Sequence, residues 1–164
     1  MKKWIVISAL LALLLAGCGG KAAPVDPALT IDGVTFTPES AVADVLETLG
    51  EDYEYYEAIS CVYDGMDKTY SYGDVTLYTY PDGETDRLME LYCTGGSVSA
   101  GDVTIGSTAE DVKAAFGSGY TEAGSVLTYA LEPESEQNTP ASLYFELEDG
   151  KVCAIAMTAE HRAE

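Results

Sequence analysis

Side chains that could do chemistry are few in this 164-residue sequence. The single histidine, His161, lies in a polar tail, and no Gly-x-Ser-x-Gly, His-Glu-x-x-His or phosphate-binding loop occurs. Residues 82–86 (Asp-Gly-Glu-Thr-Asp) alternate oxygen ligands as calcium loops do, but the remaining ligands of such a loop are missing. The sequence therefore predicts no catalytic residue, no metal site, no cofactor, and a solvated hairpin loop at 82–86.

The most distinctive polar segment is residues 50–58, with the sequence GEDYEYYEA. Four acidic residues interleave with Tyr53, Tyr55 and Tyr56, and tyrosine combines a large apolar body with a polar tip. Two interpretations stay open. The segment is either a solvated loop whose tyrosines cover a sheet edge, or an acidic aromatic patch for a basic protein segment or a sugar.

The N-terminus has the layout of a secretory leader. Lys2 and Lys3 precede an apolar run at 4–15, which is shorter than the roughly 20 residues needed to cross a bilayer. The run ends in Leu-Ala-Gly-Cys, which resembles the lipobox of bacterial lipoproteins. The resemblance implies cleavage before Cys18 and diacylation of its thiol, and two acyl chains give stable attachment. It places the protein on the outer, extracytoplasmic face of the cell membrane.

Charge limits the choice of partners. The chain has 28 acidic and 8 basic residues, for a formal net charge of −20. Such a chain repels nucleic-acid phosphates and anionic lipid headgroups, so nucleic acid is excluded as a partner. Besides Cys18 there are three cysteines, which allow at most one internal disulfide. Strand alternation predicts that Cys93 and Cys153 are packed, unpaired residues facing the helices, whereas Cys61 stays undecided.

An internal repeat organises the rest of the chain. The segment VTFTPESAVADVLETLG at 34–50 matches VTIGSTAEDVKAAFG at 103–117. Asp44 and Asp111 lie 67 residues apart, and Asp82-Gly83 and Asp149-Gly150 keep the same offset. Each copy predicts a short strand, a helix that ends at a glycine, and then further strands. The helices are expected to start at Thr37-Pro38 and at a capping box led by Ser107. The later strands are expected at 68–72, 75–80, 87–93, 126–131, 142–147 and 151–157.

The predicted fold class is α+β, with two tandem helix-plus-antiparallel-sheet repeats that form one curved sheet with helices on one face. The predicted segments are a signal peptide (1–17), a flexible tether (18–28), repeat 1 (29–98), repeat 2 (99–158) and a polar tail (159–164).

The repeated pattern and the later LYFELEDGKVCAI resemble the small domain shared by beta-lactamase inhibitor proteins and the SmpA/OmlA outer-membrane lipoproteins. This resemblance covers about residues 29–158 and implies a curved sheet whose concave face binds proteins.

Alternation along the strands predicts which residues face that surface. Leu143, Phe145 and Leu147 should face the helices, and an offset of 67 then turns Thr76, Tyr78 and Tyr80 inward. The same offset turns Val75, Leu77 and Thr79 outward. The candidate protein-binding residues are Tyr53, Tyr55, Tyr56, Leu77, Thr79, Tyr92, Tyr144 and Glu146.

These observations predict a lipid-anchored, non-catalytic protein-binding module of the cell envelope, either an interaction partner or an inhibitor-like protein. The alternative is an accessory lipoprotein that binds a glycan or a divalent cation.

Overall fold

A computed structural model describes residues 28–131 and 140–159 of the chain. Strands make up 54% of the described residues and helices 13%, and both helices are short. The expected α+β class is therefore wrong, because the protein is largely β. The predicted leader, Cys18 and most of the tether and tail lie outside the described residues. No helix within the described ranges is long and apolar enough to cross a membrane.

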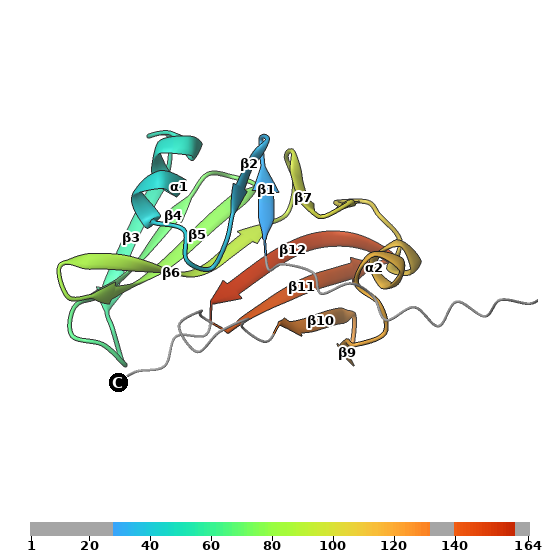
Figure 1. The fold of residues 1–164 in the computed structure, drawn as a ribbon. Coiled ribbons are helices and arrows are strands. Elements are labelled where there is room, and N and C mark those ends of the chain that lie inside the picture. Colours follow the sequence, from blue (N-terminus) through green and yellow to red (C-terminus); the bar gives the residue numbers. More distant parts are fainter. Residues whose placement is uncertain (1–27, 132–139, 160–164) are drawn as a thin grey trace, which may run out of the picture.

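The main element is an antiparallel sheet of eight strands in the order β3-β4-β5-β6-β12-β11-β10-β9 (Figure 1). The first four strands of this order are β3 (Glu54–Ile59), β4 (Met66–Ser71), β5 (Val75–Asp82) and β6 (Thr85–Cys93). The other four are β9 (Thr121–Ala123), β10 (Val126–Leu131), β11 (Ala141–Glu148) and β12 (Lys151–Ala159). Strands β6 and β12 pair at the centre, so the sheet is continuous between the two halves of the chain.

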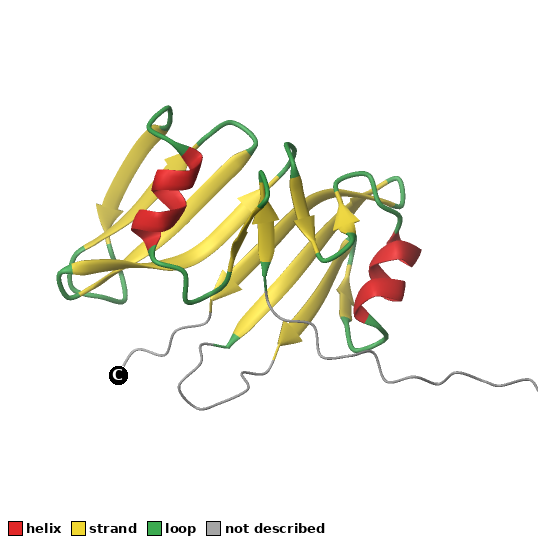
Figure 2. Cartoon of the chain, turned by 45° about the horizontal axis from the view of Figure 1, so that its top comes forward, coloured by secondary structure: helices red, strands yellow, loops and turns green. Residues whose placement is uncertain are grey.

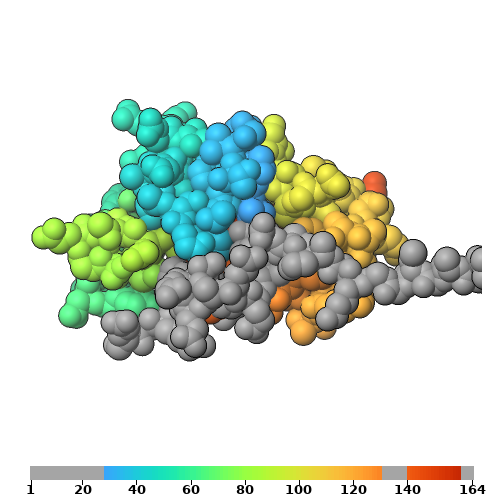
Figure 3. Space-filling model, in the orientation of Figure 1, coloured from blue at the N-terminus to red at the C-terminus, as the bar shows by residue number. Residues whose placement is uncertain are grey.

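A second layer covers one face of this sheet. It contains the helices α1 (Val42–Leu49) and α2 (Ala109–Phe116) and a small sheet in the order β2-β1-β7-β8. The four short strands are β1 (Leu29–Ile31), β2 (Val34–Phe36), β7 (Val98–Ala100) and β8 (Val103–Thr104). Figure 2 shows this small sheet between the two helices, and Figure 3 shows its two hairpins side by side at the surface. One hydrophobic core fills the space between the layers.

The helices are shorter than predicted at their starts. α1 begins at Val42, after a turn in which the Thr37 N–H donates to Ser40 Oγ (2.9 Å), and Ala41 provides no side-chain cap. α2 does have a capping box, but Thr108 and Asp111 form it, one residue later than the predicted Ser107 and Glu110. Each helix therefore contributes about two turns to a layer that strands share.

Both predicted helix ends are confirmed. Gly50 and Gly117 have φ angles of 87° and 81°, a region that glycine adopts without a steric penalty. Each glycine carbonyl accepts a hydrogen bond of 3.1 Å from a tyrosine hydroxyl, from Tyr72 directly after β4 for Gly50 and from Tyr129 on β10 for Gly117. These matched bonds attach each helix end to its own half of the sheet.

The two halves have the same order of elements. Each half runs through two short strands, a helix and the four strands that it contributes to the large sheet, and both sheet orders are symmetrical about their centres. That the halves derive from one duplicated unit stays a prediction.

Candidate protein-binding face

Strand registers define the two faces of the large sheet. Residues that lie side by side across the strands form rows. The row that contains Leu91 is buried beneath the second layer at every position except the edge residue Tyr55. Its members are Tyr55, Tyr70, Leu77, Leu91, Met157, Leu143 and Tyr129. Because side chains alternate along a strand, the neighbouring row points to the opposite side. That row is Glu54, Ser71, Thr76, Tyr92, Ala156, Tyr144, Thr128 and Thr121.

We call the side with the Tyr92 row the open face. The views in Figures 1 and 2 place the helices and the small sheet on the other side of the large sheet. A second row of the open face consists of Tyr56, Thr69, Tyr78, Glu90, Thr158, Ser142 and Ala130. The open face is thus built from tyrosines, hydroxyl side chains, carboxylates and two alanines, whereas the buried row that contains Leu91 is aliphatic and aromatic.

A polar cluster occupies the centre of the open face. The Tyr92 hydroxyl on β6 donates to Glu146 Oε2 on β11 at 3.3 Å, across the intervening strand β12. Glu90 lies two residues from Tyr92 on the same strand, opposite Thr158. The buried Thr158 Oγ1 has no hydrogen-bond partner among the described residues. All these side chains are partly buried, so the cluster offers acceptors and aromatic surface to a ligand that lies flat on the sheet.

Burial shifts the proton affinities of this cluster. Burial, and secondarily the nearby Glu146 carboxylate, raises the pKa of Glu90 above its ordinary value of 4.5. The pKa of the Tyr92 hydroxyl is also raised, first by burial and then by Glu146. Both shifts have the same cause: a negative charge at the centre of the sheet is poorly solvated and faces another carboxylate.

Replacing Glu90 with glutamine should therefore raise the melting temperature at about pH 7. The raised folded-state pKa means that ionised Glu90 disfavours the fold, and this cost is present above that pKa and is lost as the pH falls through it. Melting curves across pH measure the effect, and the two proteins should converge below the ordinary value of 4.5. Equal melting temperatures at every pH would contradict the stated environment of Glu90.

The structure separates the eight predicted binding residues into two groups. Tyr56, Tyr92, Tyr144 and Glu146 lie on the open face. The other four, Tyr53, Tyr55, Leu77 and Thr79, do not. Tyr53 and Tyr55 each pack against Tyr70 with ring centroids 5.2 Å apart, at the margin of the covered face.

The prediction for Leu77 and Thr79 is wrong, since both are 0% exposed. Val75 is buried as well, while Thr76 and Tyr78 lie on the open face. The error comes from the turn alignment. Gly83-Glu84 are the two turn residues between β5 and β6, whereas Asp149-Gly150 are the two between β11 and β12. The true strand offset is therefore 66, and a shift of one residue exchanges the faces.

Sequence reasoning missed Glu90 and Tyr78 as parts of the open face. Glu90 belongs to the alternation of β6, in which Tyr92 was already assigned outward, so its position was available from spacing alone. Tyr78 was missed because it was turned inward by the same one-residue error.

The three described cysteines are free thiols. Cys93 is fully buried in the core, as predicted, and burial raises its pKa to about 12. Cys153 does not belong to the core. It lies at the irregularity between Glu146 and Leu147 of the partner strand, where its thiol donates to the Glu146 carbonyl at 3.4 Å. The β-bulge explains why simple alternation misplaced it.

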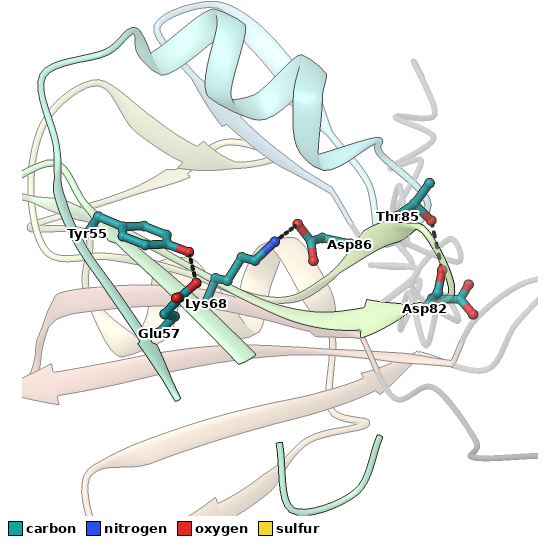
Figure 4. Close-up of polar contacts among 6 residues, drawn as sticks. All are labelled: Tyr55, Glu57, Lys68, Asp82, Thr85 and Asp86. Carbon is teal, nitrogen blue, oxygen red and sulfur yellow. Dashed lines mark hydrogen bonds and ion pairs between the residues drawn. The ribbon is translucent and has the colours of Figure 1, made fainter. Parts of the chain in front are cut away.

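The acidic loop at 82–86 is held by the protein's own cations. Lys68 Nζ lies 2.8 Å from Asp86 Oδ2, and Arg87 Nε lies 2.8 Å from Asp82 Oδ2. Figure 4 shows the Lys68–Asp86 pair beside Tyr55 and Glu57, with the Thr85 hydroxyl donating to the Asp82 carbonyl. Among the described residues, no group of three or more His, Cys, Asp or Glu side chains is placed to hold a metal ion.

In comparisons with known proteins, no family model, no curated protein and no solved structure matches the chain.

Proposed function

We propose that this protein is a lipid-anchored, non-catalytic module that binds another protein at the cell envelope through the open face of its large sheet. The observation that carries the proposal is the central cluster of Tyr92, Glu146 and Glu90, with Tyr144 beside it on the same face. Tyrosine is enriched at interface centres because its ring provides area while its hydroxyl finds a partner. The lipid on Cys18 would hold this face at the membrane surface.

Partner capture from detergent-solubilised membranes, followed by titration of the captured protein, tests the proposal. Tyr92→Ala and Tyr144→Ala should each weaken binding by about 2 kcal/mol, or roughly 30-fold, because central aromatic residues carry much of an interface's affinity. Tyr53→Ala is the matched control, since the same truncation is made at an exposed tyrosine on the margin of the other face. Equal losses from all three variants would contradict binding by the open face.

A glycan is the second candidate, favoured by the hydroxyl side chains that flank the tyrosines. Ser71, Thr76 and Thr128 share one row with Tyr92 and Tyr144. Hydroxyls and carboxylates on a flat aromatic surface suit the many donors of a sugar. Capture that survives protease treatment but is lost on glycan hydrolysis would favour this candidate over a protein partner.

A further inference from the structure

We propose that the free edge of the large sheet, strand β3, receives an extended basic segment of another protein as an added ninth strand. This site is separate from the open face, because its main contacts are backbone groups at the edge of the sheet. It concerns the segment in which the sequence left open a solvated loop or an acidic aromatic patch. The second half of that segment belongs to a six-residue strand, β3.

The direction of the β3 backbone groups follows from its register. The Ser60 N–H donates to the Gly65 carbonyl at 3.0 Å, and this pair continues the unbroken β3–β4 register. In an antiparallel pair, opposed residues alternate between those that exchange hydrogen bonds and those that do not. Hence Glu54, Tyr56 and Ala58 bond to β4. The N–H and C=O groups of Tyr55, Glu57 and Ile59 point away from the sheet and are available to another strand.

This edge has only one of the devices that usually prevent strand addition, the charged side chains of Glu54 and Glu57. Such devices are short strands, proline, charged side chains (lysine above all) or a bulge. The strand at the opposite edge, β9, has only three residues, and this short length protects it from strand addition. β3 has six residues, no proline or lysine, and a regular register.

Exposed apolar side chains also gather at β3. Of the seven exposed large hydrophobic residues in the described chain, five lie between positions 53 and 62: Tyr53, Tyr55, Tyr56, Ile59 and Val62. Ile59 is 80% exposed and Tyr56 67%. Three of the five, Tyr55, Tyr56 and Ile59, belong to β3, and such a concentration of exposed apolar side chains marks a site of interaction.

Charge identifies the occupant as a basic segment of another protein. Glu54 and Glu57 lie on opposite faces of β3, so both faces of an added strand would meet a carboxylate. Lys68, the one lysine of the neighbouring strand, is neutralised by Asp86. A second copy of this chain would bring another net charge of −20 to the edge. Lysine or arginine stems would instead pack on the exposed tyrosine rings, with their charges near the carboxylates.

Hydrogen exchange of the full chain with a peptide of alternating lysine and valine tests the geometry. The amides of Tyr55, Glu57 and Ile59 should exchange quickly in the free protein and slowly with the peptide bound. Those of Glu54, Tyr56 and Ala58 should be protected already by β4. Binding of the peptide without new protection at the three outward amides would overturn the proposal. A peptide in which proline replaces valine should not bind. Equal binding of this peptide would mean that charge attraction alone holds it, and would overturn strand addition.

A matched pair of variants isolates the central backbone donor. Glu57→Pro and Glu57→Ala remove the same carboxylate and the same hydrogen bond from the Tyr55 hydroxyl, but only proline removes the outward N–H. Edge strands tolerate proline where the N–H faces solvent, so both variants should melt alike. The peptide should bind Glu57→Pro roughly tenfold more weakly than Glu57→Ala. Equal affinities for two equally stable variants would overturn the proposal.

Two further outcomes separate this inference from the alternatives. Tyr92→Ala should leave peptide affinity unchanged, whereas a loss would move the peptide to the open face and overturn strand addition at β3. Sedimentation should show that the chain alone is a monomer. If the chain instead formed a dimer, and Glu57→Pro dissociated that dimer, the occupant of the edge would be a second copy of the chain. This result would overturn the proposal of a basic segment. Neither result at β3 depends on whether a partner binds the open face.

Discussion

Replacing Leu77 with alanine should lower the free energy of unfolding by about 2–5 kcal/mol. Leu77 is 0% exposed and belongs to the core, in register with Tyr70 on one side and Leu91 on the other. The substitution removes buried methyl groups and leaves a cavity in a row whose neighbours are held by strand pairing. Chemical denaturation monitored by circular dichroism measures the change.

Thr76→Ala is the control for this prediction, because Thr76 precedes Leu77 on the same strand and points to the open face. Its effect should be about 0.5 kcal/mol or less. The two variants together decide the orientation of β5. If Thr76→Ala were the more damaging change, the strand would have the orientation that the 67-residue offset predicts.

The orientation of β5 shows where sequence reasoning failed. Both halves contain Asp-Gly between two strands, and aligning these pairs is the natural choice. In the structure, Asp82 is the last residue of β5, whereas Asp149 is itself a turn residue with a φ angle of 51°. Which residues occupy a two-residue turn depends on the register of the whole hairpin, and a single sequence does not determine this.

Strand β3 was hidden for a different reason. Its sequence, EYYEAI, shows no alternation of apolar and polar residues, because both sides of this edge strand are exposed. Periodicity detects a strand through the contrast between a buried and a solvated side, and here that contrast is absent. The helix ends were predictable, since a glycine directly after an apolar stripe is a local signal that needs no tertiary context.

The second half of the sheet was predicted correctly where its own alternation was clear. Leu143 and Phe145 are buried at 0%, and Tyr144 between them points to the open face. The apolar side of this strand is strictly aliphatic and aromatic, so no alignment to the first half was needed. The first half lacks such contrast, since Thr79 is buried and Tyr78 is not.

Phe145→Ala should be the most destabilising single change in this strand, at about 3–5 kcal/mol. Phe145 joins the sheet to α2, with its ring centroid 5.1 Å from that of Phe116 and 6.0 Å from that of Tyr129. Truncation removes the contacts of one ring with two others, beyond the area that Phe145 itself buries. The loss should appear in calorimetric melting as a lower transition temperature.

Tyr144→Ala is the matched comparison that connects this prediction to function, because Tyr144 is adjacent to Phe145 and points to the opposite face. Its removal should cost about 1 kcal/mol, since no second layer of described residues packs on the open face and few buried contacts are lost. A cost equal to that of Phe145→Ala would mean that the Tyr144 side of the sheet is itself a buried interior. A partner could then not reach Tyr92 and Glu146, and binding by the open face would lose its physical basis. A small cost combined with a large loss of partner affinity is the pattern that an interface residue gives and a core residue does not.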